Sequence, residues 1–422
     1  MFKRELWRTR AGPAGLACRR LSTDGMLRSV RASVSADSKV RVALFHPALI
    51  SGGIPRVFVN LARGFRDQGL AVDIVQATPS SGLHPGVPEG VRQIDLNASR
   101  ALTSLPLLVR YLRRERPQVV ISGAIQTNLV AVLAKRLARI PLQLILTEHN
   151  VISAISSDAP MARTRMTPFF VRNLYPSADE LVAVSQGAAK DLALTMGKRA
   201  PNIRVIYNPV FGPDFWKRTA EPLNDSRIEG DSRPTILAVG RLHYHKDYPT
   251  LLRAVAILRR SVDAKLVFLG DGEERGALET SSRELQIADA VSFLGTIRNP
   301  LPYMKHARVL ALSSVVEALP TVLIEALAVN LPIVATDCPT GPREILEGGK
   351  YGTLVPVGDS ELMAVALGAV LQKPQKPEVP AEALERFQHR HVIAQYLELM
   401  GLRQSIETSR RTPNHECSGG ST

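Results

Sequence analysis

The sequence predicts an α/β protein of two consecutive Rossmann-like, doubly wound domains, whose parallel sheets face a central cleft. Three observations support this fold class. With 422 residues, the chain exceeds the size at which a single hydrophobic core keeps growing, so two domains are expected. Short apolar runs alternate with longer amphipathic segments, a pattern that predicts βαβ units and parallel sheets. The alternation stops near residue 211 and starts again near residue 234.

The first domain is expected over residues 39–210. Its strand-like runs are VRVALFHPA, LAVDIVQA, QVVISGA, LQLILTEH and ELVAVS, and VIYNPV closes this half. Each run is short and rich in Val, Ile and Leu, as expected of strands buried on both faces of a parallel sheet. A Gly-Gly loop, SGGIP, leads from the first run into the helical pattern RVFVNLARGFRDQG.

A polar, irregular linker is expected over residues 211–233, before the second domain at 234–385. The second domain repeats the pattern with the runs TILAVGRL, AKLVFLGDG, VSFLG, RVLALSS and PIVATD. Helical patterns separate these runs, at 249–260, 273–286, 300–306, 320–329 and 342–347. Pro-rich KPQKPEVP precedes a last helix, assigned to 386–403, and a tail at 404–422 that we expect to be disordered.

Residues 1–38 are interpreted as a basic, disordered N-terminal extension. The segment is rich in Arg and Ser and poor in acids, which is also typical of an organelle transit peptide. A third interpretation is that the chain begins at Met26. The three cysteines, Cys18, Cys338 and Cys417, have neither metal-site nor disulfide-framework spacing, which agrees with a reducing, cytoplasmic compartment.

The formal net charge of +14 is concentrated in the first half of the chain. Residues 41–200 carry 19 Lys and Arg against 10 Asp and Glu. Such an excess favours an anionic partner, which could be membrane lipid, a phosphorylated substrate or nucleic acid; a solvated cationic surface is the alternative. No apolar run reaches the about 18 residues that a membrane-spanning helix needs.

One basic segment leaves two interpretations open. The helix around LLVRYLRRERP combines Leu and Tyr with four arginines. It could lie on an anionic membrane on the cytoplasmic side, or it could pack in the core with its charged side exposed. Nucleic acid is a weaker candidate partner, because the chain has no zinc-finger spacing, no aromatic RNA-binding motif and only 5% aromatic residues.

Two turns of the second half carry residues suited to a phosphate ligand. In GRLHYHKDYPTLL, a turn at Gly240 places Arg241 and Lys246 just beyond a strand. Arg can bind a diphosphate with a bidentate fork, and Lys can bind it as a point charge. In FLGDGEER, Gly270 and Gly272 permit a tight turn and a close backbone approach.

Two glutamates flank the start of an apolar helix in EALPTVLIE. Glu317 is expected in the loop and Glu325 in the second helical turn. A buried carboxylate needs hydrogen-bond donors, and the hydroxyls of a ribose or of another sugar can supply them. The alternative is that both glutamates are simply exposed.

Taken in their order and spacing, these motifs resemble the donor domain of retaining GT-B glycosyltransferases of family 4. The resemblance rests on GRLHYHKDYPTLL, FLGDGEE, VSFLG and EALPTVLIEALAVNLPIVATDCPTGPREIL, and it covers residues 235–360 closely. SGGIPRVFVNLARGF and the stretch from YPSA to YNPV extend it to residue 41. NPLPYM and CPTGPREIL are most similar to bacterial members that transfer hexoses or N-acetylhexosamines to lipid-linked or polysaccharide acceptors.

The resemblance implies a role for each matching residue. Arg241 and Lys246 would bind the diphosphate of a nucleotide sugar, which by analogy with the family is a UDP-sugar. Glu325 would bind the ribose, and Glu317 would face the donor sugar.

Other positions follow from the same resemblance. The backbone at Ile297 and Arg298 would meet the base, and Gly52 and Gly53 would pack against the phosphates. His149, in LTEHN, would lie at the reacting centre. One departure is visible, because Ala318-Leu319 stand where the family commonly has Gly-Phe, and this bears on the identity of the donor sugar.

The implied reaction transfers the sugar to an acceptor hydroxyl with retention at the anomeric carbon. Arg241, Lys246 and a helix N-terminus near Gly341 would stabilise the leaving diphosphate, so neither a metal nor another cofactor is expected. Two other functions remain open: a GT-B nucleotide-sugar epimerase, which needs no acceptor, and a catalytically silent partner of another transferase.

Overall fold

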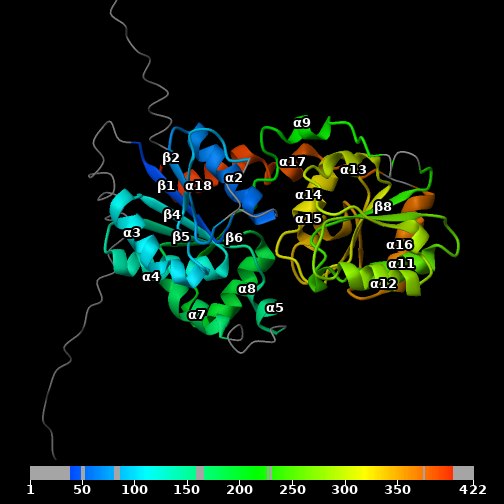
Figure 1. Cartoon of the computed structure of the whole chain (residues 1–422), viewed down its shortest axis with the longest axis horizontal. Helices are drawn as coiled ribbons and strands as arrows, with labels where there is room; N and C mark the ends of the chain where they lie inside the picture. Colours follow the sequence, from blue (N-terminus) through cyan, green and yellow to red (C-terminus); the bar gives the residue numbers. More distant parts are fainter. Residues whose placement is uncertain are drawn as a thin grey trace, which may run out of the picture. The chain divides into compact units, whose positions relative to one another are not determined.

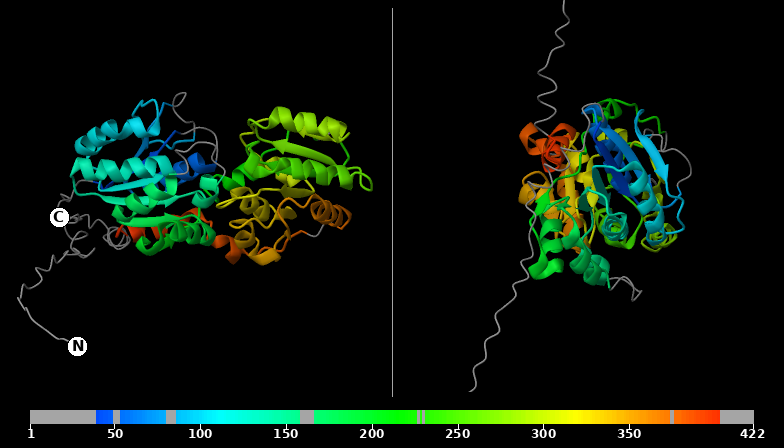
Figure 2. Two further views of the ribbon diagram at one scale, coloured as in Figure 1. Left: turned by 90° about the horizontal axis from the view of Figure 1, so that it is seen from below. Right: turned by 90° about the vertical axis from the view of Figure 1, so that its left-hand side faces the viewer.

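The protein contains two parallel sheets, each with helices on both faces (Figures 1 and 2). The computed structural model describes residues 39–48, 53–79, 86–157, 166–225, 228, 231–373 and 376–402. The expected N-terminal extension and C-terminal tail, as well as Gly52, lie outside the described residues. The predicted fold class of two doubly wound domains is confirmed. We call the sheet of β1–β7 with its helices the first lobe, and the sheet of β8–β13 with its helices the second lobe.

The first lobe has a seven-stranded sheet in the order β3-β2-β1-β4-β5-β6-β7. Its strands are β1 (Arg41–His46), β2 (Ala71–Gln76), β3 (Arg92–Asp95), β4 (Val119–Gly123), β5 (Gln143–Glu148), β6 (Glu180–Ala183) and β7 (Ile203–Val205). Successive side chains of a strand point to opposite faces, and here both faces are buried. On β1, Ala43 and Phe45 enter one core cluster, whereas Val42 and Leu44 enter the other.

Helices cover both faces of this sheet. One face packs against α3 (Leu105–Glu115), α4 (Ile125–Ala138), α7 (Thr167–Leu174) and α8 (Gln186–Met196). The other face packs against α2 (Gly53–Asp67) and α18 (His389–Leu399). Helix α5 (Ile152–Ser157) follows the end of β5.

The second lobe has a six-stranded sheet in the order β10-β9-β8-β11-β12-β13. Its strands are β8 (Thr235–Val239), β9 (Lys265–Leu269), β10 (Val291–Phe293), β11 (Val309–Leu312), β12 (Ile333–Thr336) and β13 (Thr353–Val355). Helices α11 (Tyr248–Leu258) and α16 (Ser360–Gln372) cover one face. Helices α13 (Leu301–His306) and α14 (Thr321–Ala328) cover the other, while α12 (Arg275–Glu284) and α15 (Pro342–Ile345) follow β9 and β12.

Two expectations about the connections need correction. The linker contains a short helix, α9 (Phe215–Thr219), because Phe211 and Phe215 are buried in the core of the second lobe. The last helix is divided into α17 (Ala381–Glu385) and α18. Arg386 and Phe387 form a turn between them, and the carbonyl of Phe387 accepts hydrogen bonds from the backbone N–H groups of Val210 and Phe211.

The C-terminal helix α18 returns to the first lobe. Its Val392, Ile393 and Tyr396 pack in the same core cluster as α2, and the two helices lie side by side in Figure 1. They can approach closely because Gly64 of α2 has no side chain: a Cβ there would lie 2.3 Å from Ile393 Cδ1. The last helix, which follows the second domain in the sequence, therefore completes the core of the first lobe.

The structure favours core packing for the basic helix α3. Its Leu108, Tyr111 and Leu112 are buried, whereas Pro106 and Leu107 are exposed, Leu107 at 37%. The Arg113 guanidinium donates to the backbone carbonyl of Leu137 at 2.8 Å. In the described part of the chain, no helix is long and apolar enough to cross a membrane.

A buried carboxylate joins the edge of the first sheet to α3. Asp73 of β2 accepts hydrogen bonds from Arg92 of β3 at 2.6 and 2.7 Å, from Arg41 of β1 at 3.2 Å, and from the Tyr111 hydroxyl at 2.7 Å. Burial alone would raise the pKa of Asp73, but the hydrogen bonds from Arg92 and Tyr111 and the charges of both arginines outweigh it. The pKa therefore lies below its ordinary value of 3.8.

We expect Asp73→Asn to lower the free energy of unfolding by about 1–3 kcal/mol at pH 7, because a neutral amide replaces the buried charge that accepts from both guanidinium groups, while Arg92 keeps Glu115 as a partner. Since folding depresses the pKa of Asp73, its stabilisation is present above pH 3.8 and is lost as the pH falls through the folded-state pKa. The difference between variant and wild type should therefore shrink in acid. Urea denaturation at several pH values measures it, with the exposed Asp67→Asn as control; a loss at pH 7 no larger than in the control would contradict this role.

Candidate functional site

The site residues predicted in the second half gather along one edge of the second sheet. They follow the carboxyl ends of its strands: Gly240, Arg241 and Lys246 come after β8, Gly270 and Gly272 after β9, Ile297 and Arg298 after β10, Glu317 and Glu325 after β11, and Gly341 after β12. Open parallel sheets bind ligands at this edge, where the strand order reverses. In the second sheet the reversal lies between β8 and β11. Arg241, Lys246 and Glu317 lie in the loops that leave these two strands.

A cavity of about 220 Å³ brings the four predicted catalytic residues together. It lies between the loop after β5 in the first lobe and the loops after β8 and β11 in the second. Its lining residues are His149, Asn150, Val151, Ala154, Arg241, His243, His245, Lys246, Val316, Glu317 and Ala318. Sequence reasoning identified four of these side chains and missed Asn150, His243 and His245.

An ion pair crosses the floor of this cavity. Lys246 Nζ lies 2.6 Å from Glu317 Oε1, and the Ser314 hydroxyl donates to the same oxygen at 2.7 Å. The Thr340 hydroxyl donates to the backbone carbonyl of Glu317. Neither glutamate of EALPTVLIE is exposed, so the interpretation of two solvated carboxylates is wrong.

The loops after β8 and β9 touch backbone to backbone. Gly270 has a φ of 147°, and a Cβ there would lie 1.9 Å from the carbonyl oxygen of Gly240. A Cβ on Gly272 would lie 2.2 Å from the carbonyl oxygen of Leu242. No side chain fits at either position, which explains the paired glycines of FLGDGEER and fixes the turn that carries Arg241.

His149 is neutral and holds a defined tautomer. The Thr147 hydroxyl donates to the carbonyl of Ser122 at 2.9 Å, so it accepts from His149 Nε2–H at 3.1 Å. Nδ1 is then an acceptor, and it is buried without a hydrogen-bond partner among the described residues. Burial, followed by the nearby His46, lowers the pKa of His149 to about 3. An acceptor of this kind can receive a hydrogen bond from a ligand hydroxyl.

Glu148 holds the loop that carries His149. Its Oε1 accepts from the backbone N–H groups of His149 and Asn150, both at 3.1 Å, and its Oε2 accepts from the Tyr175 hydroxyl at 3.0 Å. Burial raises the pKa of Glu148 to about 7, against the lowering effect of these hydrogen bonds. The sequence places Glu148 at the end of a strand, next to two of its partners, but it does not show that Tyr175, 27 residues further along the chain, is the third.

Arg241 is less tightly held than Lys246. Its side chain is 71% exposed and lies 3.1 Å from Glu273, which is also close to His243. Such an exposed pair contributes little to stability, so the guanidinium can turn towards a ligand at small cost.

Glu325 is bound by a residue of the other lobe. Its Oε1 lies 2.6 Å from Nη1 of Arg56, in the first turn of α2, and its side chain is only 6% exposed. Sequence reasoning missed Arg56, although it follows Gly52 and Gly53 closely in SGGIPR. Of that loop, Gly53 begins α2 and Gly52 lies outside the described residues.

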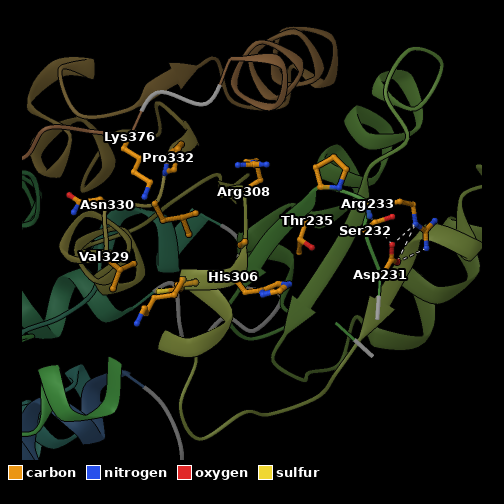
Figure 3. A pocket seen from close by; sticks show the side chains of 15 residues that line it. Asp231, Ser232, Arg233, Thr235, His306, Arg308, Val329, Asn330, Pro332 and Lys376 are labelled. Carbon is orange, nitrogen blue, oxygen red and sulfur yellow. Dashed lines mark hydrogen bonds and ion pairs between the residues drawn. The ribbon is translucent and has the colours of Figure 1, made fainter. Parts of the chain in front are cut away.

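A larger cavity, of about 620 Å³, lies at the opposite edge of the second sheet. Thr235, which begins β8, and Arg308 and Pro332, which precede β11 and β12, line it (Figure 3). Asp231, the only acidic side chain among the described residues that line it, is paired with Arg233. No predicted site residue reaches this cavity, and parallel sheets do not bind their ligands at the amino ends of the strands. We therefore take the smaller cavity as the candidate site.

The helix that was predicted to begin near Gly341 is short. Gly341 has a φ of 90° and caps α15, which has four residues. Its Arg343 is paired with Asp337. Among the described residues, no group of three or more His, Cys, Asp or Glu side chains is placed to hold a metal ion.

Two family models match the chain. Residues 51–210 match the model described as Glycosyltransferase Family 4, and residues 223–387 match the model described as Glycosyl transferases group 1. A Campylobacter jejuni protein, the N-acetylgalactosamine-N,N'-diacetylbacillosaminyl-diphospho-undecaprenol 4-alpha-N-acetylgalactosaminyltransferase, is 33% identical over 204 residues. The match covers 48% of this chain and 54% of that protein, so the chain spans about half the length of this relative.

A second relative matches over more of its length. The amylovoran biosynthesis glycosyltransferase AmsD of Erwinia amylovora is 27% identical over 326 residues, which are 77% of this chain and 88% of that protein. Among solved structures, Anabaena HepE in complex with UDP has a TM-score of 0.63 and 18% identity over 88% of this chain and 99% of its own. The predicted GT-B fold is thereby confirmed.

We expect Glu148→Gln to remove a pH dependence of stability. Because folding raises the pKa of Glu148 from 4.5 to about 7, its contribution is fully present below pH 4.5 and is lost as the pH rises through 7. At about 1.4 kcal/mol per pKa unit, the wild type should lose roughly 3 kcal/mol over this range relative to the variant. Urea denaturation at pH 4.5 and 8 measures the difference, with the exposed Glu361→Gln as control. Parallel curves for wild type and Glu148→Gln would show that Glu148 titrates normally.

Proposed function

Because the chain belongs to the group 1, family 4 glycosyltransferases, we propose that it transfers a hexose or N-acetylhexosamine from a nucleotide-diphosphate sugar to an acceptor hydroxyl. The donor is a UDP-sugar, the acceptor is a lipid-linked glycan or polysaccharide precursor, and the anomeric configuration is retained without a metal ion. One observation carries this proposal: a single cavity gathers His149, Arg241, Lys246 and Glu317 from both lobes.

The relatives support the choice of donor and acceptor. The Campylobacter protein is named for a diphospho-undecaprenol substrate, and the Erwinia protein for the biosynthesis of amylovoran. The Anabaena structure, which shares the fold, is in complex with UDP. A lipid-linked or polysaccharide acceptor and a UDP-linked donor are thus the substrates that best agree with these names.

Lys246 and Arg241 stabilise the leaving group in this proposal. Negative charge develops on the diphosphate as its bond to the sugar breaks, and two cations placed beforehand stabilise it more in the transition state than in the bound donor. The carboxylate of Glu317 orients Lys246. When the donor binds, Nζ turns to the diphosphate, and the carboxylate of Glu317 becomes free to accept from a hydroxyl of the donor sugar.

His149 orients the sugar and does not act as a general base. With a pKa of about 3 it binds a proton weakly near neutral pH, and its free Nδ1 can only accept a hydrogen bond. A hydroxyl of the donor sugar supplies that bond. The acceptor hydroxyl then attacks the anomeric carbon from the face that the leaving diphosphate occupies. A phosphate oxygen takes the proton of this hydroxyl.

The nucleoside end of the donor lies along the same sheet edge. Glu325 accepts from the ribose hydroxyls, and the backbone at Ile297 and Arg298 meets the base. Gly53 begins α2, where the free N–H groups of a helix N-terminus face an anion.

A panel of nucleotides tests this proposal directly. A ligand that binds only the folded protein stabilises it, by about 2.7 kcal/mol at a ligand concentration of 100 times the Kd. This stabilisation raises the melting temperature. We expect UDP and UDP-sugars to raise it, with EDTA present throughout, while GDP and ADP raise it less. A rise that requires Mg²⁺ or Mn²⁺ would contradict the metal-free scheme. Conversion of a UDP-sugar in the absence of an acceptor would favour an epimerase. Binding of the UDP-sugar without any turnover would favour a catalytically silent partner.

Lys246→Ala should raise the activation free energy that kcat/KM reports by at least about 2 kcal/mol, by comparison with the removal of a single oxyanion donor. The reason is that Nζ is the less exposed of the two cations near the leaving diphosphate. Steady-state assays on the variant and on Lys305→Ala, a lysine outside this cavity, measure the effect. Turnover close to that of the wild type would exclude Lys246 from the diphosphate site.

A further inference from the structure

Arg56 and Glu325 form an ion pair between the lobes at the nucleoside end of the site. The guanidinium comes from the fourth residue of α2 and the carboxylate from the second turn of α14, 269 residues further along the chain. Nη1 and Oε1 are 2.6 Å apart. The carboxylate is buried, whereas the guanidinium is 40% exposed.

Arg56 occupies a position that is unfavourable for a cation. The N-terminus of a helix carries partial positive charge and favours anions, and the first turn of α2 contains no acidic residue. An arginine there is stabilised only by an anion from outside the helix. In the structure that anion is Glu325.

Arginines outnumber carboxylates in the region around Arg218 and Glu325. Burial and then the charge of Arg56 lower the pKa of Arg218 in α9, the charges of Glu325 and Glu221 raise it, and the charge of Arg298 lowers it. Three guanidinium groups therefore share two carboxylates, of which Glu325 is the more buried, so an additional anion would be stabilised there.

The donor and Arg56 compete for the same carboxylate. If ribose hydroxyls donate to both oxygens of Glu325, as the proposed function requires, Oε1 is no longer available to Arg56. The displaced guanidinium stays on the first turn of α2, directly after the glycine loop that is expected to pack against the phosphates. The diphosphate arrives together with the ribose and is the nearest new anion.

We propose that Arg56 exchanges partners when the donor binds, leaving Glu325 for the diphosphate of the nucleotide. Arg56 is then a positioning residue that couples the first lobe to the phosphates and makes the site selective for a nucleotide over its nucleoside. This inference rests on the proposed function. The exchange also keeps every buried charge paired, because Glu325 gains hydroxyl donors as it loses the guanidinium.

Uridine and UDP separate this role from a purely structural one. In Arg56→Ala, uridine should bind as tightly as in the wild type or a few times more tightly, because Glu325 no longer has a competing partner. The ratio of UDP affinity to uridine affinity should fall at least tenfold from its wild-type value, because the diphosphate has lost a cation. Isothermal titration of both ligands into the full chain measures the two affinities.

Two further variants make the result decisive. Arg63→Ala removes another arginine of α2, which is paired with Asp214 of the linker, and should leave the UDP-to-uridine ratio unchanged. Arg56→Lys retains the charge and should recover part of the ratio. An unchanged ratio in Arg56→Ala, with UDP still bound, would overturn the exchange alone. Absence of UDP binding in the wild type would overturn the proposed function and the exchange with it.

Discussion

The candidate site depends on the contacts of Glu317, which hold three loops of the second sheet at one place. Its carboxylate binds Lys246 from the loop after β8 and Ser314 from the loop after β11, and its carbonyl accepts from Thr340 after β12. Each loop leaves a different parallel strand, and further bonds join the same loops: the Ser313 hydroxyl donates to the carbonyl of Lys246, and the Thr336 hydroxyl to the carbonyl of Ser314. The backbone contact of Gly270 with Gly240 adds the loop after β9. The carboxylate of Glu317 therefore acts together with several backbone contacts to set the geometry of this sheet edge.

Two ion pairs of the site limit the kind of ligand that can bind. Lys246 is paired with Glu317, and Arg56 with Glu325; Lys246 and both carboxylates are largely buried, whereas Arg56 is 40% exposed. Removing the partner of a buried charge is strongly destabilising unless that charge gains a new partner. A simple anion would satisfy the cations but leave the carboxylates unpaired, and a neutral sugar would do the reverse. A sugar nucleotide brings both phosphate oxygens and hydroxyl donors.

The sequence predicted the elements whose cause is local. Buried parallel strands appear in the sequence as short apolar runs. The residues that bind a ligand are expected directly after the carboxyl end of such a run. Strand β3 was missed because its sequence, RQID, is polar and only its pairing with β2 makes it a strand. The packing of α18 against the first lobe and the pairing of Glu325 with Arg56 were missed for a related reason. Both depend on contacts across more than 250 residues, and no local pattern encodes them.

The departure at Ala318-Leu319 can be assessed from the contacts of this loop. The Ser185 hydroxyl, at the N-terminus of α8, donates to the backbone carbonyl of Ala318 at 2.7 Å, so the first lobe holds the loop through its main chain. Leu319 is buried in the core of the second lobe. A glycine and a phenylalanine could make the same backbone contact and fill a similar core position. The departure therefore changes packing beneath the loop while leaving its carbonyl and Glu317 in place, and its effect should fall on the choice of sugar before it falls on the chemistry.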